Sequence, residues 1–152
     1  MNSPADQSQR FEALDVSQSF IVQAPAGSGK TELLTRRFLR LLAVVDKPES
    51  ILAITFTKKA ASEMLNRILK ALRIAQVPPI KMTPPEREQF EIAKVALARD
   101  RELGWNLLDN PGRLRVSTVD SLSVSLVRQM PFLSRLGAPP VIVPSGCSTG
   151  GV

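Results

Sequence analysis

The clearest hydrophobic pattern lies in residues 20–45, where a short apolar run is followed by helical spacing. Residues 20–23 read FIVQ, which predicts a short buried strand. Beyond residue 31, apolar side chains recur every three or four positions, and this spacing predicts an amphipathic helix. These apolar positions are Leu34, Phe38, Leu41 and Val45. A glycine-rich stretch separates the two segments, so the pattern predicts strand, loop and helix in that order.

A second strand and helix are predicted after Pro48. Residues 51–54 form another apolar run, and helical spacing follows over residues 61–72. The apolar face of that helix consists of Ala61, Met64, Leu65, Ile68 and Leu72. The order of elements in the first unit is therefore repeated in the second.

Proline positions delimit the remaining elements. Four prolines between residues 78 and 85 predict a loop, because proline ends a helix. Thr83 and Glu86 have the spacing of a capping box, which predicts a third helix as far as about residue 98. A weaker helical stretch is predicted at residues 102–108, a third strand at 114–118 and a last helix at 122–130. Strands that alternate with helices indicate an α/β domain with a parallel sheet.

The composition indicates the number of domains and the distribution of charge. The 152 residues amount to about one domain, and the hydrophobic content of 43% is enough for a core. Basic residues outnumber acidic ones by 20 to 14, and residues 30–73 alone hold ten basic and four acidic residues. The net charge of +6 therefore lies in one segment, as expected of a surface that faces phosphate groups or of a solvated helix face.

The cysteine content and the apolar runs of the sequence indicate the cellular compartment in which the protein is expected. Cys147 is the single cysteine, so no internal disulfide can form. The first twenty residues contain Asp6, Glu12 and Asp15, whereas a secretory signal needs a continuous apolar stretch. The longest strictly apolar run, residues 41–45, is far shorter than the roughly 18 residues that cross a bilayer. We therefore expect a cytoplasmic protein without a membrane span.

Residues 24–31 read APAGSGKT, the spacing of a phosphate-binding P-loop with alanine in place of the first glycine. Gly27 and Gly29 would let the backbone turn, so that amide hydrogens converge on phosphate oxygens at the positive end of the following helix. Lys30 would reach the β and γ phosphates, and the hydroxyl of Thr31 would ligate magnesium. The strand before the motif and the helix after it supply the context that a P-loop requires.

Hydrolysis of a nucleotide needs an acidic site as well, usually an aspartate after another strand and often a neighbouring glutamate. Asp46 follows an apolar run, but this run continues the helical spacing, which favours a helix end. Asp120 follows the third predicted strand, and neither aspartate precedes a glutamate. An open alternative is a complete small P-loop phosphotransferase, a nucleotide or metabolite kinase, with Asp46 or Asp120 as its acid.

Three motifs in order resemble those of the superfamily 1 DNA helicases of the UvrD, Rep and RecB type. Residues 23–31, QAPAGSGKT, resemble motif I of that family. Residues 51–64, ILAITFTKKAASEM, are similar to motif Ia, and residues 116–122, VSTVDSL, resemble the motif that follows it. Gln9 stands 21 positions before Lys30, the offset of the adenine-reading glutamine in these helicases. The amino-acid sequence of residues 20–42 looks most like that of bacterial RecB or AddA-type chains.

The resemblance covers the chain to about residue 137 and implies a partial RecA-like domain, the N-terminal part of helicase lobe 1A. In such a domain, helices flank a parallel sheet. The family implies ATP and Mg²⁺ as cofactors, Lys30 and Thr31 as catalytic residues, and Thr31 as the metal ligand. The implied nucleotide-binding residues are Gln9, Ala24, Pro25, Ala26, Gly27, Ser28, Gly29, Lys30 and Thr31.

The family also implies a track for single-stranded DNA. Its residues in this chain would be Phe56, Thr57, Lys59, Ser117 and Thr118. Phe56 would offer an aromatic face to a DNA base, although the pattern alone favours a core residue that follows a buried strand. Asp120 stands where many relatives have histidine, and its role stays open. Subunits of a helicase–nuclease complex are further implied partners.

On this resemblance we expect the N-terminal piece of an ATP-dependent DNA helicase of repair or recombination. Because the family's Asp-Glu motif and arginine fingers are not found in the sequence, we expect weak nucleotide binding, no ATP turnover and no unwinding by this chain alone. A regulatory fragment that binds DNA or a partner helicase would share every motif. Residues 138–152 carry no charge, and we expect a disordered tail or sequence that does not continue the domain.

Overall fold

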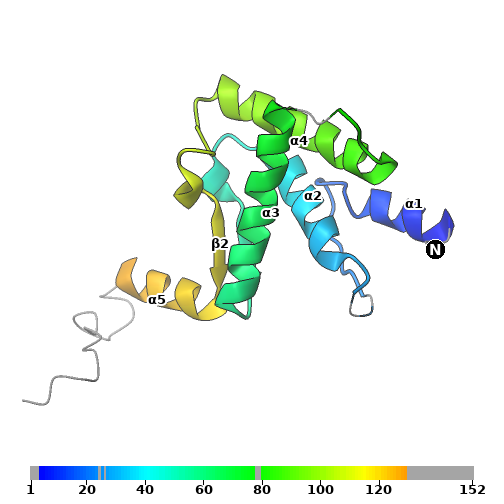
Figure 1. Cartoon of the computed structure of the whole chain (residues 1–152). Coiled ribbons are helices and arrows are strands. Elements are labelled where there is room, and N and C mark those ends of the chain that lie inside the picture. Colours follow the sequence, from blue (N-terminus) through cyan, green and yellow to red (C-terminus); the bar gives the residue numbers. More distant parts are fainter. Residues whose placement is uncertain (1–3, 24, 26, 78–79, 130–152) are drawn as a thin grey trace, which may run out of the picture. The chain divides into compact units, whose positions relative to one another are not determined.

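The computed structural model describes residues 4–23, 25, 27–77 and 80–129 (Figure 1). The chain divides into two compact units, residues 1–118 and 119–152. Ala24, Ala26, Met130 and the predicted tail at 138–152 lie outside the described residues.

In the described part of the first unit, two helices precede each of two strands. Its helices are α1 (Pro4–Glu12), α2 (Lys30–Leu42), α3 (Lys58–Gln76) and α4 (Pro84–Glu102), and its strands are β1 (Leu52–Thr55) and β2 (Arg115–Thr118). Short 3₁₀ turns at Pro48–Ser50 and Pro111–Arg113 precede the two strands. The described part of the second unit is α5 (Val119–Gln129), at the position predicted for the last helix. Helix α1 was not predicted from the apolar pattern.

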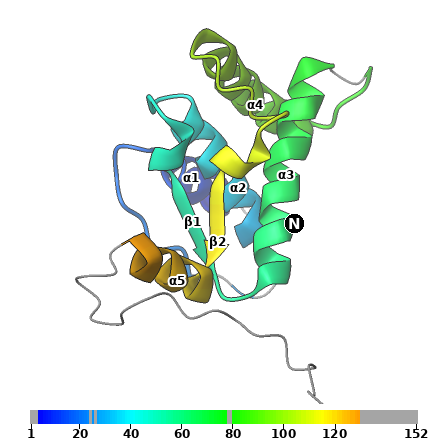
Figure 2. The same ribbon diagram turned by 90° about the vertical axis from the view of Figure 1, so that its left-hand side faces the viewer.

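The two strands form the parallel sheet that the alternation predicted. Leu52 lies opposite Arg115, and Thr55 lies opposite Thr118, so the carboxyl ends of both strands meet at one edge (Figure 2). The turns before the strands are tied together, because Arg113 donates from Nε to Oε1 of Glu49 at 2.6 Å. This contact holds the pKa of Glu49 below its ordinary value. The described residues thus form a partial α/β domain, a small parallel sheet flanked by helices.

Three helices make the core of the first unit. Helix α3 packs on α4, and α2 packs on both. The fully buried side chains at these contacts include Leu39 and Leu42 of α2, Ile68 and Leu72 of α3, and Ala93 and Ala96 of α4. The predicted face of α3 is confirmed, with Leu65 at its partly buried margin.

The apolar face predicted for residues 34–45 is confirmed at Phe38, and Leu41 and Val45 pack partly buried against the core. The prediction is wrong at one position. Leu34 is 49% exposed, whereas Leu33, Leu39 and Leu42 are buried. The helix carries leucines on more than one stripe, so spacing alone permits two faces. Packing against α3 and α4 selects between them.

The predicted strand at residues 20–23 is wrong. The described residues of this segment form no ladder with β1 or β2, and Ile21 is fully exposed. A strand requires hydrogen bonds from a neighbouring strand, and an apolar run reports only a tendency to be buried. The segment instead follows a loop that is fixed by the guanidinium of Arg37.

The predicted helical stretch at residues 102–108 is also wrong, because α4 ends at Glu102. Gly104 has φ of 62°, and the amide of Trp105 donates to the carbonyl of Asp100 at 3.0 Å. A glycine in the left-handed region with such a bond is a common helix stop. The buried carboxylate of Asp100 accepts the amide of Leu107 at 3.1 Å, which fixes the chain beyond the stop.

The predicted capping residues of α4 are in place. The backbone N–H and the hydroxyl of Thr83 donate to Oε2 of Glu86 at 2.8 and 2.7 Å. These two bonds hold the pKa of Glu86 below its ordinary value of 4.5. A carboxylate whose pKa is lowered on folding stabilises the folded state above the unfolded pKa, and this contribution is lost as the pH falls through the folded value.

We therefore expect Glu86→Ala to lower the urea midpoint of unfolding at pH 7. The difference in urea midpoint between the wild type and Glu86→Ala should shrink as the pH falls below about 4.5 toward the lowered pKa, because the carboxylate of Glu86 then becomes protonated. Urea titrations followed by circular dichroism at pH 7, 5 and 3 measure this convergence. Glu91→Ala, which removes another exposed carboxylate of α4, is the control. An equal deficit for Glu86→Ala at every pH would contradict the role of the charged cap.

Candidate functional site

The glycine-rich loop has the backbone geometry that its sequence predicted. Gly27 and Gly29 have φ of 78° and 83°, values that favour glycine over any residue with a side chain. Helix α2 begins at Lys30, directly after Gly29, and the amide of Leu33 donates to the carbonyl of Gly29 at 3.0 Å. The ammonium of Lys30 donates to the carbonyl of Pro25 at 2.7 Å. The first amides of α2 therefore follow a sharply turned loop, the arrangement that attracts anions.

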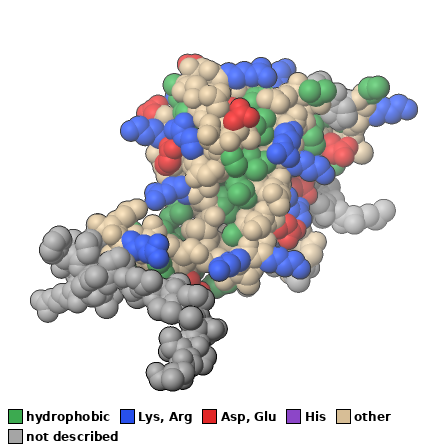
Figure 3. Space-filling view, turned by 60° about the vertical axis from the view of Figure 1, so that its left-hand side comes forward, with side chains coloured by type: hydrophobic (Ala, Val, Ile, Leu, Met, Phe, Trp, Pro, Cys, Tyr) green, Lys and Arg blue, Asp and Glu red, His purple; other side chains and the backbone are tan. Residues whose placement is uncertain are grey.

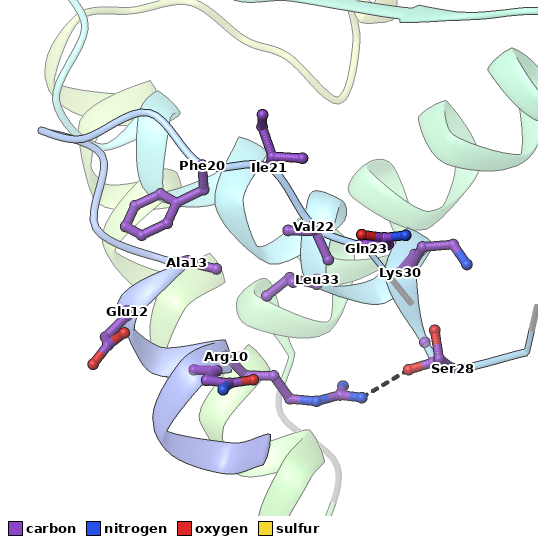
Figure 4. Close-up of a pocket in the computed structure, with 12 residues that line it drawn as sticks. Arg10, Glu12, Ala13, Phe20, Ile21, Val22, Gln23, Ser28, Lys30 and Leu33 are labelled. Carbon is purple, nitrogen blue, oxygen red and sulfur yellow. Dashed lines mark hydrogen bonds between the residues drawn. The ribbon is translucent and has the colours of Figure 1, made fainter. Parts of the chain in front are cut away.

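A cavity of about 280 Å³ opens beside this loop (Figure 4). Of the predicted nucleotide-binding residues, Gln9, Ser28, Gly29 and Lys30 line it. Pro25, Gly27 and Thr31 belong to the adjoining loop and the first turn of α2, while Ala24 and Ala26 lie outside the described residues. The structure thus brings Gln9 of α1 and the glycine-rich loop to the same cavity, although they are separated along the chain.

Arg10 is a residue of this cavity that the sequence analysis missed. Its Nη2 donates to the carbonyl of Ser28 at 2.7 Å, which joins α1 to the loop (Figure 4). A Cβ placed on Gly29 would lie 3.4 Å from Nη1 of Arg10. A single arginine next to Gln9 carries no sequence signal for such a contact, because the contact spans 18 positions.

Leu33 also lines the cavity, and Phe20 and Ala13 give it an apolar portion on the side away from Lys30 (Figure 4). The Oγ atom of Ser28 is buried and has no hydrogen-bond partner among the described residues. An unsatisfied buried hydroxyl usually indicates a missing polar partner such as water, an ion or a ligand. The cavity therefore combines a polar end that suits phosphate groups with an apolar portion that suits a ring.

The residues predicted to contact DNA meet at the carboxyl edge of the sheet. Phe56 directly follows β1 and is 90% exposed, so the alternative that it belongs to the core is wrong. Ser117 and Thr118 end the neighbouring strand, and Thr118 lies opposite Thr55 in the register. The pairing thus places the ends of both strands on one side of the unit, together with Phe56, which follows β1 in the chain.

These residues differ in how accessible they are. Lys59 is exposed, whereas Ser117 is half-buried and Thr118 is buried. The hydroxyl of Thr57 accepts the amide of Ala60 at 3.1 Å and so caps α3. Phe56, Thr57 and Lys59 are therefore exposed, and of these Thr57 also uses its hydroxyl to cap α3.

The basic segment does not form one uniform surface. Arg36 pairs with Glu32 and Glu88 at 2.6 and 2.8 Å, and Arg67 pairs with Glu63 at 2.8 Å. Figure 3 shows one face on which lysine and arginine side chains are spread around a central group of hydrophobic side chains. Part of the positive charge counted in the sequence is therefore neutralised by internal contacts, and Lys58 and Lys59 are exposed near Phe56.

Asp46 does not form an acidic site with the glycine-rich loop. Asp46 follows the far end of α2, about 20 Å along a helix of this length from Lys30, and pairs with Arg99 at 3.2 Å. Asp120 is an exposed residue in the first turn of α5, in the second unit. Among the described residues, no group of three histidine, cysteine, aspartate or glutamate side chains could hold a metal ion. The position of Asp46 and its pairing with Arg99 do not favour the phosphotransferase alternative with Asp46 as the acid.

No helix among the described residues is long and apolar enough to span a membrane.

Comparison with known proteins agrees with this geometry. Residues 5–138 match the family model of the UvrD/REP helicase N-terminal domain. One subunit of an ATP-dependent helicase/nuclease from Desulfitobacterium hafniense is 33% identical over 139 residues, which are 90% of this chain and 9% of that protein. DNA helicase II from Haemophilus influenzae is 55% identical over 53 residues, 34% of this chain and 7% of the relative.

A third relative is the ATP-dependent DNA helicase PcrA from Staphylococcus aureus. It is 45% identical over 64 residues, which are 41% of this chain and 9% of PcrA. The matched region spans less than a tenth of the length of each of these three relatives. The family match covers most of this chain, including the glycine-rich loop, both strands and the helices between them. The chain therefore belongs to the UvrD/REP helicase family, within the N-terminal domain of that family.

Proposed function

We propose that this protein binds ATP with Mg²⁺ at the glycine-rich loop and single-stranded DNA at the carboxyl edge of the sheet. These would be two working sites of an ATP-dependent DNA helicase that serves repair or recombination. The observation that carries the proposal is the common placement of the two sites: in both ribbon views the start of α2 and the carboxyl ends of β1 and β2 lie at the same end of the first unit (Figures 1 and 2). Nucleotide binding and strand contact would then both involve that end of the unit.

The residues present fit a nucleotide on three counts. Gly27 and Gly29 hold the turned backbone, the buried hydroxyl of Ser28 has no partner among the described residues, and Lys30 supplies a positive charge at the cavity wall. We propose that Lys30 would neutralise the terminal phosphates and that Thr31 would hold Mg²⁺, the ion that offsets phosphate charge during hydrolysis. Gln9 would face the base, as the family resemblance implies.

DNA contact would rest first on Phe56 and Lys59. An exposed aromatic ring offers a flat face to any base, and this stacking is tolerant of sequence. Lys59 would attract the phosphate backbone, and Thr57, Ser117 and Thr118 would border the path of the strand. The helicase/nuclease name of one relative supports the proposal that other subunits of such a complex are partners. The phosphotransferase alternative has no observation that favours it.

Lys30→Ala should weaken ATP binding about 10- to 150-fold, because a hydrogen bond to a charged group contributes about 1.5–3 kcal/mol. Isothermal titration calorimetry with MgATP measures the loss. Lys94→Ala, which removes an equal charge from the exposed face of α4, should leave the affinity unchanged. Equal affinities for wild type and Lys30→Ala would contradict the proposed phosphate site.

Gly29→Ala should weaken ATP binding and also lower stability by about 1 kcal/mol, because a side chain in the left-handed region is strained. Urea unfolding and the same ATP titration measure the two effects. Gly112→Ala is the matched control, since a Cβ at that position meets open space and its φ is not in the left-handed region. A Gly29→Ala variant as stable as Gly112→Ala would show that the loop adopts another conformation in solution.

Phe56→Ala should weaken binding of a single-stranded oligonucleotide about 5- to 150-fold, because base stacking on an aromatic side chain contributes about 1–3 kcal/mol. Fluorescence anisotropy of a labelled oligothymidylate at low salt measures this. Phe11→Ala removes another exposed phenylalanine, on α1, and serves as the control. If both variants bind DNA as the wild type does, the sheet edge is not the DNA track. Phosphate transfer to a small acceptor would instead support the phosphotransferase alternative.

A further inference from the structure

The guanidinium of Arg37 lies among three carbonyl groups of a single loop. Its Nη1 donates to the carbonyls of Ala13 and Asp15 at 2.6 and 2.9 Å, and its Nη2 donates to the carbonyl of Gln18 at 2.6 Å. Its central carbon also lies 5.3 Å from the centroid of the Phe20 ring. A planar fork of donors can serve several acceptors at once, which a lysine ammonium does less well.

The loop that Arg37 holds connects α1 to the segment before the glycine-rich loop. Its two ends, Ala13 and Phe20, line the same cavity as Gln9 and Lys30 (Figure 4). Arg37 itself is not a lining residue of that cavity and reaches the loop from α2. The arginine therefore fixes one wall of the cavity from behind.

Other contacts fix this loop less completely. Leu14 is buried and anchors its start. The carboxylate of Asp15 accepts hydrogen bonds from the amide and hydroxyl of Ser17 at 2.9 and 2.7 Å, but these bonds lie within the loop. Arg40 reaches the carbonyl of Leu14 at the longer distance of 3.5 Å. The later part of the loop is therefore held by Arg37, through its hydrogen bond to the carbonyl of Gln18 and its contact with the ring of Phe20.

The wall that Arg37 fixes is distinct from the phosphate end of the cavity. Ser28, Gly29 and Lys30 form the polar end, while Ala13 and Phe20 are apolar and the latter is aromatic. A flat apolar surface suits the ring of a nucleoside base, and ring stacking is favourable. Loss of order in residues 13–20 would therefore affect base binding and leave the phosphate loop in place.

We infer that Arg37 is a positioning residue that orders the base-binding wall of the nucleotide cavity without contacting the nucleotide. This inference rests on the proposed ATP site and adds to it a residue that determines preference for a nucleotide over bare polyphosphate. Ordering the wall before binding removes an entropic cost from the binding step. Arg37→Lys keeps the charge and loses the fork, so it separates positioning from charge.

The test compares MgATP with magnesium tripolyphosphate on ¹⁵N-labelled wild type and Arg37→Lys by NMR titration. We expect the substitution to weaken ATP binding about tenfold, or about 1.4 kcal/mol, and to change tripolyphosphate binding less than about twofold. Amides of residues 27–31 should still respond to both ligands, whereas those of residues 20–23 should lose their response to ATP. A general loss of structure would weaken both ligands alike.

Arg67→Lys is the matched control, because Arg67 pairs with Glu63 on the exposed side of α3 and lies outside this cavity. A second measurement requires no variant. In the wild type, ATP should slow hydrogen exchange in residues 13–20, and tripolyphosphate should not. If Arg37→Lys does not fold, this measurement still tests whether residues 13–20 form the base-binding wall.

The outcomes separate the inference from the function on which it rests. If the wild type binds neither ligand, the proposed ATP site is wrong. If the wild type prefers ATP and a folded Arg37→Lys variant keeps that preference, or binds both ligands more weakly by the same factor, only the role of Arg37 is overturned. Equal binding of both ligands by the wild type, or equal protection of residues 13–20 by both, would likewise overturn it.

Discussion

The packing of α2 against α3 and α4 is the interaction on which the rest of the first unit depends. Leu39 and Leu42 are fully buried in this contact, so the helix has a fixed rotation about its axis. That rotation determines where its polar side chains point. Arg37 reaches the loop after α1, and Arg36 reaches Glu88 of α4. The same helix begins at Lys30, so the core and the candidate phosphate site share one rigid element.

The arginines of α2 show why a count of charges is a weak guide to a binding surface. A guanidinium in contact with backbone carbonyls or a carboxylate organises the protein itself and is less available to DNA. Arg36 and Arg37 are of this kind, whereas Lys59 is exposed beside Phe56. The proposed DNA track therefore depends on a few accessible side chains and an aromatic ring. The concentration of positive charge along the sequence does not define it.

The parallel register and the glycine-rich loop together account for the two proposed sites. Parallel strands end at one edge, so Phe56 and Thr118 come together although β1 and β2 are separated by two helices. Ligands of open α/β sheets bind outside the carboxyl ends of the strands. Asp46, by contrast, follows the opposite end of α2 and pairs with Arg99. The topology thus brings Phe56 and Thr118 to one edge of the sheet, whereas Asp46, a candidate from the local pattern, lies elsewhere.

The sequence by itself determined the features that depend on local chemistry. These include the turned glycines before Lys30, the cap of α4 at Thr83, the apolar runs that became β1 and β2 and the family motifs, because each is set by a few neighbouring residues. Tertiary structure alone decided that residues 20–23 form no strand and that Arg37 holds the loop after α1. It also selected Leu33 over Leu34 for burial and exposed Phe56. These outcomes depend on which distant segment supplies hydrogen bonds or apolar contact, and no local periodicity contains that information.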